Sequence, residues 1–505
     1  MPKEVLGVIN RLRQRGFEAF AVGGCVRDVL LGKKPADWDV ATNAKPEEIQ
    51  ELFPQNFYAN KFGTVTVLRP FGATEEQADI FEIDEVEVTT YRTDAGYSDM
   101  RHPDEVKFTP SLKEDLARRD FTINAMAMVA EGDGRKSPLA PLAKGVDGVV
   151  IDNLLIIDPF GGMKDLDARV IRAVGDPEER FSEDALRLLR AVRFAAQLDF
   201  EIEPATFTAI KKMARNIRAV SQERIRDELV KMIMCENPEY GFNLLQKTGL
   251  LLEILPEMDE GVGVEQNLHH KYTVFEHLIK SLQYAARYDY PLHVRLAALF
   301  HDIGKPRTRR KKGNEFTFYG HDIVSERITQ KVLKRLRFSN ELNEKVTNLV
   351  RHHMFYYDIG KVTDAGARRL LRRVGKENFD DLIKVRIAER KGSGVPKAEP
   401  YRLRHLQFLV EKAAQEPVTV GELAIGGNDL MKDLGMKPGP KIGGVLNALL
   451  AEVLDNPVLN NREHLLSRAQ ELKDKDPDEL KKMGEEAKEK EEKRREDDIK
   501  RKYHV

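Results

Sequence analysis

The sequence predicts an α+β fold in which a mixed head is followed by a mostly helical remainder. In the first third of the chain, short apolar or alternating runs typical of strands are interleaved with helical patterns. Beyond the turn-rich segment at 158–162, apolar residues recur largely at helical spacing. Because 505 residues exceed what one hydrophobic core usually holds, we expect several domains.

The changes of pattern divide the chain into five segments. We expect a head at 1–157, a helical neck at 158–255, a third region at 256–398, a helical tail at 399–470 and a charged extension, helical or disordered, at 471–505.

Composition limits the classes of function that the chain can serve. Charged residues make up 33% and aromatic residues 7%, which is typical of a helix-rich soluble protein. The net charge is only −1, so nucleic-acid binding would require a local basic surface. Two cysteines give no disulfide framework, no apolar run approaches a membrane span, and the start resembles an amphipathic helix rather than a secretion signal. These features predict a cytoplasmic protein without a membrane partner.

The stretch at 21–42 contains the first candidate site. An apolar strand runs into Gly23 and Gly24, which permit a sharp turn and let a phosphate approach bare backbone amides. Arg27 follows in the first turn of a short helix, where its guanidinium can bind the same anion. The pattern predicts a phosphate-binding corner between a strand and a helix.

The next strand carries two acids that predict a magnesium site. Asp37 and Asp39 are two residues apart and project from the same face of a strand. Their charges repel unless a cation lies between them, and hard oxygen ligands beside a phosphate site suit Mg²⁺. Together these features predict binding of a nucleoside triphosphate complexed with magnesium. In the later stretch 78–91 we choose Glu87 as a third catalytic carboxylate, with an exposed strand face as the alternative.

A predicted helix at 182–200, with Ser182 as its N-cap, carries the second candidate site. Four charged residues follow one another at three-residue steps along its polar side, namely Asp184, Arg187, Arg190 and Arg193. The alternative is an ordinary ladder of exposed surface charge. An acceptor beside a donor, however, matches cytosine and adenine, which both present an amine next to an unprotonated ring nitrogen. Asp184 and Arg187 therefore predict selection of C and A without a nucleic-acid template.

These motifs together resemble a known superfamily. The run GG-x-V-R-D followed by D-W-D resembles the signature of the polymerase-β nucleotidyltransferases, in the version of class II tRNA nucleotidyltransferases (CCA-adding enzymes) and bacterial poly(A) polymerases. The run RRDFTINA at 118–125 and the pattern EDxxRxxRAxRF at 183–194 are similar to further motifs of that family. The resemblance implies a polymerase-β-like head in which Asp37 and Asp39 hold two metal ions. It also implies nucleotide contacts by Gly24, Arg27, Arg119, Asp184, Arg187, Arg190 and Arg193.

The function implied by this resemblance is addition of CCA to tRNA 3′ ends from CTP and ATP with Mg²⁺, and the tail would hold the tRNA. The alternatives within the class are a poly(A) polymerase and an enzyme that adds only A or only CC. The run FGTVTVL after Lys61 favours tRNA over poly(A) synthesis, and an expected loop at 92–102 favours A addition.

A second constellation resembles the HD metal-dependent phosphohydrolase domain. Its members are His277, His301, Asp302, His321, His352 and His353. Imidazoles with a carboxylate can bind a second divalent metal, which would activate water in a phosphatase or cyclic phosphodiesterase acting on RNA ends. A late aspartate of that family is replaced here by Glu389. An alternative of another class is therefore an HD phosphohydrolase whose head only binds nucleotide; the intact D-W-D run disfavours it.

Overall fold

The computed structural model divides into two compact units. One comprises Met1–His353 with Lys384–Val395, and the other comprises Met354–Ile383 with Pro396–Val505. The residues that the structure describes are 1–58, 63–68, 85–95, 105–130, 148–266, 271–313, 315–355, 363–394, 399–414 and 420–505. Among them, no helix combines the length and the apolar character needed to cross a membrane.

The head is built on a sheet whose described strands run in the order β3-β4-β5-β2-β1-β8-β10-β9. The strands are β1 Ala19–Val22, β2 Asp39–Thr42, β3 Asn56–Tyr58, β4 Thr64–Leu68, β5 Glu85–Thr90, β8 Ala127–Ala130, β9 Gly148–Ile151 and β10 Leu154–Ile157. Neighbours are antiparallel except β2 and β5, which run parallel. β1 is buried along its length and lies between β2 and β8 in the interior of the sheet.

Short helices surround this sheet in the head. They are α1 Lys3–Gln14, α2 Gly24–Leu30, α3 Pro46–Leu52 and α4 Leu112–Ala117. A separate hairpin pairs β6 Arg92–Ala95 with β7 Glu105–Phe108. The expected loop at 92–102 is therefore wrong for its first residues, because strand pairing continues there, and 96–102 lie outside the described residues.

The neck is helical, but the helix predicted at 182–200 is two helices. The neck elements are α5 Gly162–Asp167, β11 Val170–Ile171, α6 Pro177–Glu183, α7 Leu186–Leu198, β12 Glu201–Ile202, α8 Pro204–Met213, α9 Gln222–Ile233, α10 Pro238–Thr248 and α11 Leu250–Ile254, and α12 Pro256–Asp259 follows the neck. Ser182 lies inside α6, which Asp176 caps, and is not the expected N-cap. The chain is extended at Asp184, whose Oδ1 accepts the Leu186 N–H, so Asp184 takes that capping role for α7.

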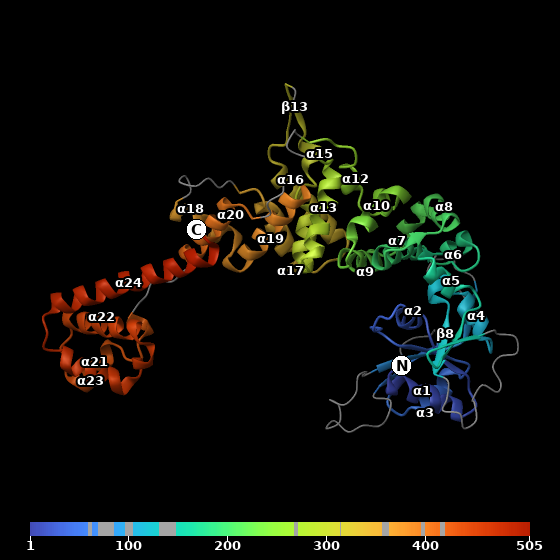
Figure 1. Cartoon of the computed structure of the whole chain (residues 1–505), viewed down its shortest axis with the longest axis horizontal. Helices are drawn as coiled ribbons and strands as arrows, with labels where there is room; N and C mark the ends of the chain where they lie inside the picture. The colour runs from blue at the N-terminus through green and yellow to red at the C-terminus, as the bar shows by residue number, and fades with distance from the viewer. Residues whose placement is uncertain are drawn as a thin grey trace. The chain divides into compact units, whose positions relative to one another are not determined.

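Further helices complete the first unit (Figure 1). They are α13 Val274–Arg287, α14 Leu292–Phe300, α15 Lys305–Thr308, α16 His321–Arg335 and α17 Asn340–His352, together with the C-terminal part of α19 Phe379–Gly392. A hairpin of β13 Arg310–Lys312 and β14 Glu315–Thr317 is inserted between α15 and α16.

The second unit contains α18 Asp364–Val374, α20 Tyr401–Ala414, α21 Gly427–Leu434, α22 Pro440–Asp455, α23 Arg462–Leu472 and α24 Pro477–Tyr503. The charged end of the chain is the long helix α24 (Figure 1). Its few apolar residues pack against the rest of the unit: Leu480 is fully buried in a core with α22 and α23, and Ile499 is also buried. Tyr503 donates a hydrogen bond to Glu411 of α20. Of the two expected states of this segment, helical or disordered, the structure has the packed helix.

Replacing Leu480 with alanine tests this packing. Removal of a fully buried leucine side chain should lower the free energy of unfolding of this unit by about 3 kcal/mol. Limited proteolysis should then cleave α24 faster than in the wild type. The matched control is Lys481→Ala, because that side chain is 68% exposed; equal cleavage of both variants would contradict the packing.

Candidate functional site

A cavity of about 530 Å³ lies between the head strands and the neck helices. Its lining residues are Gly23, Gly24, Arg27, Asp37, Asp39, Arg118, Arg119, Asp120, Asn124, Asp184, Leu186, Arg187, Arg190, Arg193, Phe194, Arg224 and Lys231. Every nucleotide-site residue expected from the sequence is among them except Glu87. Cationic side chains outnumber carboxylates two to one, which suits a ligand with several negative charges, such as a triphosphate.

The corner between β1 and α2 has the form that the sequence predicts. Gly23 adopts a φ of 83°, in the left-handed region that favours glycine. A Cβ at this position would lie 2.8 Å from Nη1 of Arg119 and 3.6 Å from Oδ2 of Asp39. The absence of a side chain at Gly23 therefore allows Arg119 and Asp39 to approach the backbone at this corner.

The acidic residues gather at the start of β2. Val22 pairs with Asp39 across the antiparallel strands, and Asp39 pairs with Glu87 across the parallel ones. Asp37 precedes β2 and is exposed, while the intervening Trp38 is buried. Burial raises the pKa of Asp39 and the charge of Asp37 adds to this, although Arg119 opposes both. A divalent cation would relieve this repulsion, so the two aspartates fit a metal site.

The structure gives less support for Glu87 as a member of this site than for the two aspartates. Burial raises its pKa, and the charge of the neighbouring Asp39 raises it further. Its side chain is exposed, however, and it does not line the cavity. A catalytic role for Glu87 stays a prediction.

The RRDFTINA segment positions two arginines at the corner. Nη1 of Arg27 donates to Oδ1 of Asn124 at 2.8 Å, and its Nε donates to Asp28 at 2.8 Å. Arg119 lies 3.4 Å from Asp115, which is itself buried. The guanidiniums are thus held in place before any ligand arrives.

An ion pair between the buried Asp120 and the half-buried Arg190 joins this segment to the neck. Oδ2 of Asp120 accepts hydrogen bonds from Nε and Nη2 of Arg190 at 2.8 and 2.6 Å. Although burial disfavours the charged carboxylate, Arg190 and the Asn124 amide together lower the pKa of Asp120 to about 2. From the sequence, Arg190 was expected to contact the nucleotide; its partner Asp120 lies 70 residues earlier in the chain, so local pattern could not identify this pair.

The expected base-reading pair borders the cavity, and both members already have partners. The carboxylate of Asp184 accepts from Nη2 of Arg224 at 2.7 Å. Arg187 donates to Glu183 at 2.5 Å and to the carbonyl oxygen of Arg118 at 2.9 Å. A base can therefore bind here only by sharing or replacing these contacts.

Arg193 is the ridge residue that is least available to a ligand. It is only 7% exposed, and its Nε lies 2.6 Å from Oε2 of the buried Glu228. Three guanidiniums, those of Arg27, Arg190 and Arg193, lie 3.7 to 5.3 Å from the Phe194 ring centroid. Phe194 was not expected from the sequence to take part in the site.

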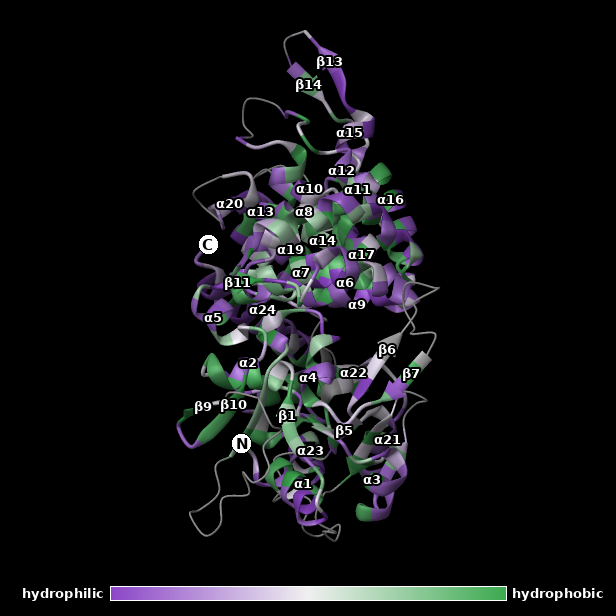
Figure 2. Ribbon diagram, turned by 90° about the vertical axis from the view of Figure 1, so that its right-hand side faces the viewer, coloured by the Kyte–Doolittle hydropathy of each residue, from purple (hydrophilic) through white to green (hydrophobic). Residues whose placement is uncertain are grey.

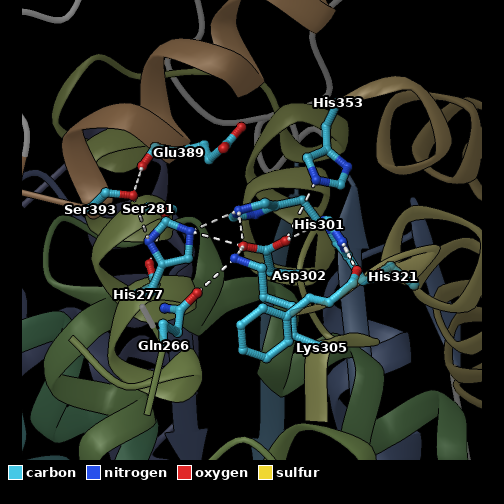
Figure 3. A network of polar contacts seen from close by, with 12 residues as sticks. Gln266, His277, Ser281, His301, Asp302, Lys305, His321, His353, Glu389 and Ser393 are labelled. Carbon is cyan, nitrogen blue, oxygen red and sulfur yellow. Dashed lines mark hydrogen bonds and ion pairs between the residues drawn. The ribbon is translucent and has the colours of Figure 1, made fainter. Parts of the chain in front are cut away.

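The histidines of the first unit form a second, buried cluster around Asp302 (Figure 3). Nε2 of His277, His301 and His321 lie 3.2 to 3.3 Å from its carboxylate oxygens, and Nε2 of His353 lies at 3.5 Å. The Lys305 ammonium is 2.6 Å from Oδ2 of Asp302.

The tautomers of this cluster favour a cation at its centre. Nδ1 of His301, His321 and His353 each donates to the backbone carbonyl three residues earlier, at 2.6 to 2.9 Å. Among the described residues, Nε2 of His321 and Nε2 of His353 then have no hydrogen-bond partner and face Asp302, while Nε2 of His301 lies 2.9 Å from Nε2 of His277. Burial lowers the pKa of His277, which favours its neutral form. Converging acceptors of this kind repel one another, so the donor set fits a divalent metal.

Two expected members of the cluster are placed differently. His353, not the preceding His352, is in the cluster; His352 ends α17 and is half-exposed. Glu389 was expected to replace a late aspartate ligand, but both of its oxygens are held by Nη1 of Arg386 at 2.5 and 2.6 Å. Although burial disfavours the carboxylate, Arg386 lowers the pKa of Glu389 to about 2. Neither residue belongs to the ligand groups found among the described residues.

Comparison with protein families gives three matches along the chain. The Poly A polymerase head domain matches residues 19–172, the "Probable RNA and SrmB-binding site of polymerase A" matches 199–261, and tRNA nucleotidyltransferase domain 2 matches 318–469.

Curated and solved relatives agree with these matches. The CCA-adding enzyme of Enterococcus faecalis is 33% identical over 486 residues, covering 94% of this chain and 97% of the relative. That of Streptococcus thermophilus is 32% identical over 472 residues, covering 93% and 97%. The crystal structure of the Bacillus stearothermophilus CCA-adding enzyme in complex with CTP is 28% identical, covers 93% of this chain and 96% of that chain, and has a TM-score of 0.54.

The Asp120→Asn variant tests the ion pair between head and neck. Its free energy of unfolding at pH 7 should be about 2 kcal/mol lower, since a pKa of about 2 instead of 3.8 measures the stabilisation of the charged carboxylate. A lowered pKa contributes stability above pH 4 that is lost as the pH falls toward 2. The wild type should therefore lose its advantage over the variant in acid.

Denaturation can be followed by the fluorescence of Trp38, the single tryptophan, which is buried in the head. The exposed Asp167→Asn is the control and should behave as the wild type. A constant difference between wild type and Asp120→Asn at all pH values would contradict the assignment.

Proposed function

The chain belongs to the family of class II CCA-adding tRNA nucleotidyltransferases, and from this premise we propose that it adds C, C and A to tRNA 3′ ends from CTP and ATP without a template. The observation that carries the proposal is that one cavity holds the glycine corner, the paired aspartates and the Asp184–Arg187 pair. Each part of a nucleoside triphosphate thus has a matching group: amides and guanidiniums for the phosphates, and a donor–acceptor pair for the base.

Enzymes of this family use divalent metal ions, and we assign Mg²⁺ to Asp37 and Asp39. Held there, the metal supplies charge neutralisation on the phosphates and lowers the pKa of the attacking hydroxyl. The chain itself contributes orientation. Arg27 is fixed by Asn124, and Arg119 lies where a Gly23 side chain would otherwise be, so both can bind phosphate oxygens without rearrangement.

Nucleotide selection would proceed by exchange of partners. The Asp184 carboxylate can accept from the exocyclic amine of C or A in place of Arg224, while Arg187 donates to the ring nitrogen. Guanine and uracil present a carbonyl and a ring N–H at these positions, so either base would leave both side chains unsatisfied.

The tRNA partner requires a local basic surface, and α18 provides one. Its exposed side chains include Arg368, Arg369, Arg372 and Arg373, which lie on one side of the helix. A solved Thermotoga maritima CCA-adding enzyme, with a TM-score of 0.50, is complexed with tRNA. Lys432 and Lys437, exposed beside the Gly435 turn, would add contacts from the tail. The free thiols of Cys25 and Cys235 fit the cytoplasm, where we place this reaction.

A second candidate activity is supported by the cluster around Asp302. The convergence of imidazole Nε2 atoms on a buried carboxylate favours a divalent metal, which would supply activated water for phosphate-ester hydrolysis at RNA ends. The residues that would hold it are His277, His301, Asp302, His321 and His353. Lys305, next to the carboxylate, could bind the phosphate.

A crossed pair of variants separates the two activities. Asp39→Ala should lower CMP incorporation into a tRNA lacking its last three nucleotides by more than about 100-fold, since loss of a direct metal ligand should exceed the effect of losing a supporting residue. His301→Ala should leave incorporation unchanged but reduce the bound divalent metal, measured by elemental analysis, by one equivalent.

Sequencing the products from tRNAs that end before C, CC and CCA distinguishes CCA addition from poly(A), A-only or CC-only addition. Loss of incorporation in His301→Ala with retention in Asp39→Ala would place the chemistry in the histidine cluster and overturn the proposal.

The Asp184→Ala and Arg187→Ala variants test base selection. A bidentate contact discriminates by about 1–3 kcal/mol, so incorporation of UMP or GMP relative to CMP should rise about 5- to 150-fold. The measurement is competition between labelled nucleotides at equal concentration. Glu178→Ala, which removes an exposed ion pair on α6, is the control; an unchanged preference in both cavity variants would remove this account of selection.

A further inference from the structure

The β13–β14 hairpin has a concentration of positive charge that the nucleotidyl transfer site does not use. The segment 305–320 contains six cationic residues and one acid, Glu315, in a chain whose net charge is −1. Figure 1 and Figure 2 both show the hairpin projecting from the helices of its unit, and β13 is strongly hydrophilic in Figure 2. An exposed strand that concentrates positive charge is suited to binding a negatively charged partner.

The cations at the base of the hairpin are already paired. Arg307 donates to both oxygens of Glu260, and Lys305 contacts Asp302. Within the described part of the chain, the three residues of β13, Arg310, Lys311 and Lys312, are exposed and have no ion-pair partner. The unneutralised charge is therefore confined to the projecting strand.

Aromatic side chains accompany this charge. Lys311 faces Phe316 across the ribbon, and the Arg309 guanidinium lies 3.6 Å from the Phe316 ring centroid. Tyr319, immediately after the hairpin, is 81% exposed. Cationic strands beside an exposed aromatic ring are the combination that binds nucleic-acid backbone and stacks an unpaired base.

The hairpin also adjoins the histidine cluster. The Phe318 carbonyl accepts the Nδ1–H of His321, and the Lys305 ammonium lies 5.6 Å from the Phe318 ring centroid. The base of the hairpin therefore contacts the residues of the cluster.

We propose that the β13–β14 hairpin is an RNA-binding arm, in which Arg310, Lys311 and Lys312 contact backbone phosphates of the tRNA and Tyr319 stacks on an unpaired base. This inference takes the identity of the RNA from the proposed function, but binding is measured without CTP or metal. A wrong assignment of the hairpin would therefore show in the binding of the variants, whereas a wrong assignment of CCA addition would show in the activity of the wild type.

The test uses the full chain and fluorescence anisotropy of a labelled tRNA lacking CCA, over a range of salt concentrations. The triple variant Arg310→Gln, Lys311→Gln, Lys312→Gln should bind about tenfold more weakly at 100 mM salt. The slope of log affinity against log salt should be smaller by about 2–3, corresponding to three lost phosphate contacts. In CMP incorporation, KM for tRNA should rise while kcat at saturating tRNA stays unchanged.

Two further variants complete the experiment. Tyr319→Ala should weaken binding at least about fivefold with an unchanged salt slope, since stacking carries no charge. The control Lys481→Gln, Lys482→Gln, Arg501→Gln removes three exposed cations from α24 and should bind as the wild type. Three outcomes would each overturn the proposal. The β13 triple variant could keep the wild-type affinity and salt slope, Tyr319→Ala could keep the wild-type affinity, or the control variant could lose as much affinity as the β13 variant.

Discussion

The site depends on arginines that are held by carboxylates before any ligand binds. Asp120 pairs with Arg190, Glu228 with Arg193, and Asp184 with Arg224. The cavity therefore concentrates positive charge while each guanidinium is held in a fixed orientation. Because Asp120 comes from the head and Arg190 from α7 of the neck, the same pair that orders the cavity also joins the elements that line it. A nucleotide can therefore bind when the side chains of the cavity exchange their present ion-pair partners for groups of the nucleotide.

The two polar clusters of the first unit differ in their electrostatic design. Around the glycine corner, cations exceed carboxylates and two aspartates are left in mutual repulsion, which suits a metal-bound polyanion. Around Asp302, buried imidazoles surround one carboxylate and one ammonium, which suits a single divalent metal. The base of the β13–β14 hairpin adjoins the second cluster, and the proposed role of its projecting charge would extend RNA binding beyond the nucleotide cavity.

Local pattern was enough to predict the corner at Gly23 and the convergence of Asp37 and Asp39, since both are set by short-range geometry. Most of the histidine cluster was expected from the resemblance of its spaced histidines to a known domain, because tertiary packing brings its members together. Local pattern failed where a competing local signal decided the backbone: Asp176 with the following proline begins α6, so the helix expected from Ser182 breaks at Asp184. Partners distant in sequence, such as Arg224 for Asp184, could not be predicted because tertiary packing selects them. The choice of His353 over His352 depends on how α17 ends, which periodicity does not resolve.

The most direct test of the account is the anomalous diffraction of crystals grown with Mn²⁺ and a non-hydrolysable CTP analogue. Mn²⁺ peaks should appear between the carboxylates of Asp37 and Asp39, with the triphosphate at Gly23 and Gly24 and the cytosine edge against Asp184 and Arg187. A nucleotide bound away from this corner, or Mn²⁺ found at the histidine cluster while Asp37 and Asp39 stay without metal, would contradict the assignment of nucleotidyl transfer to the head.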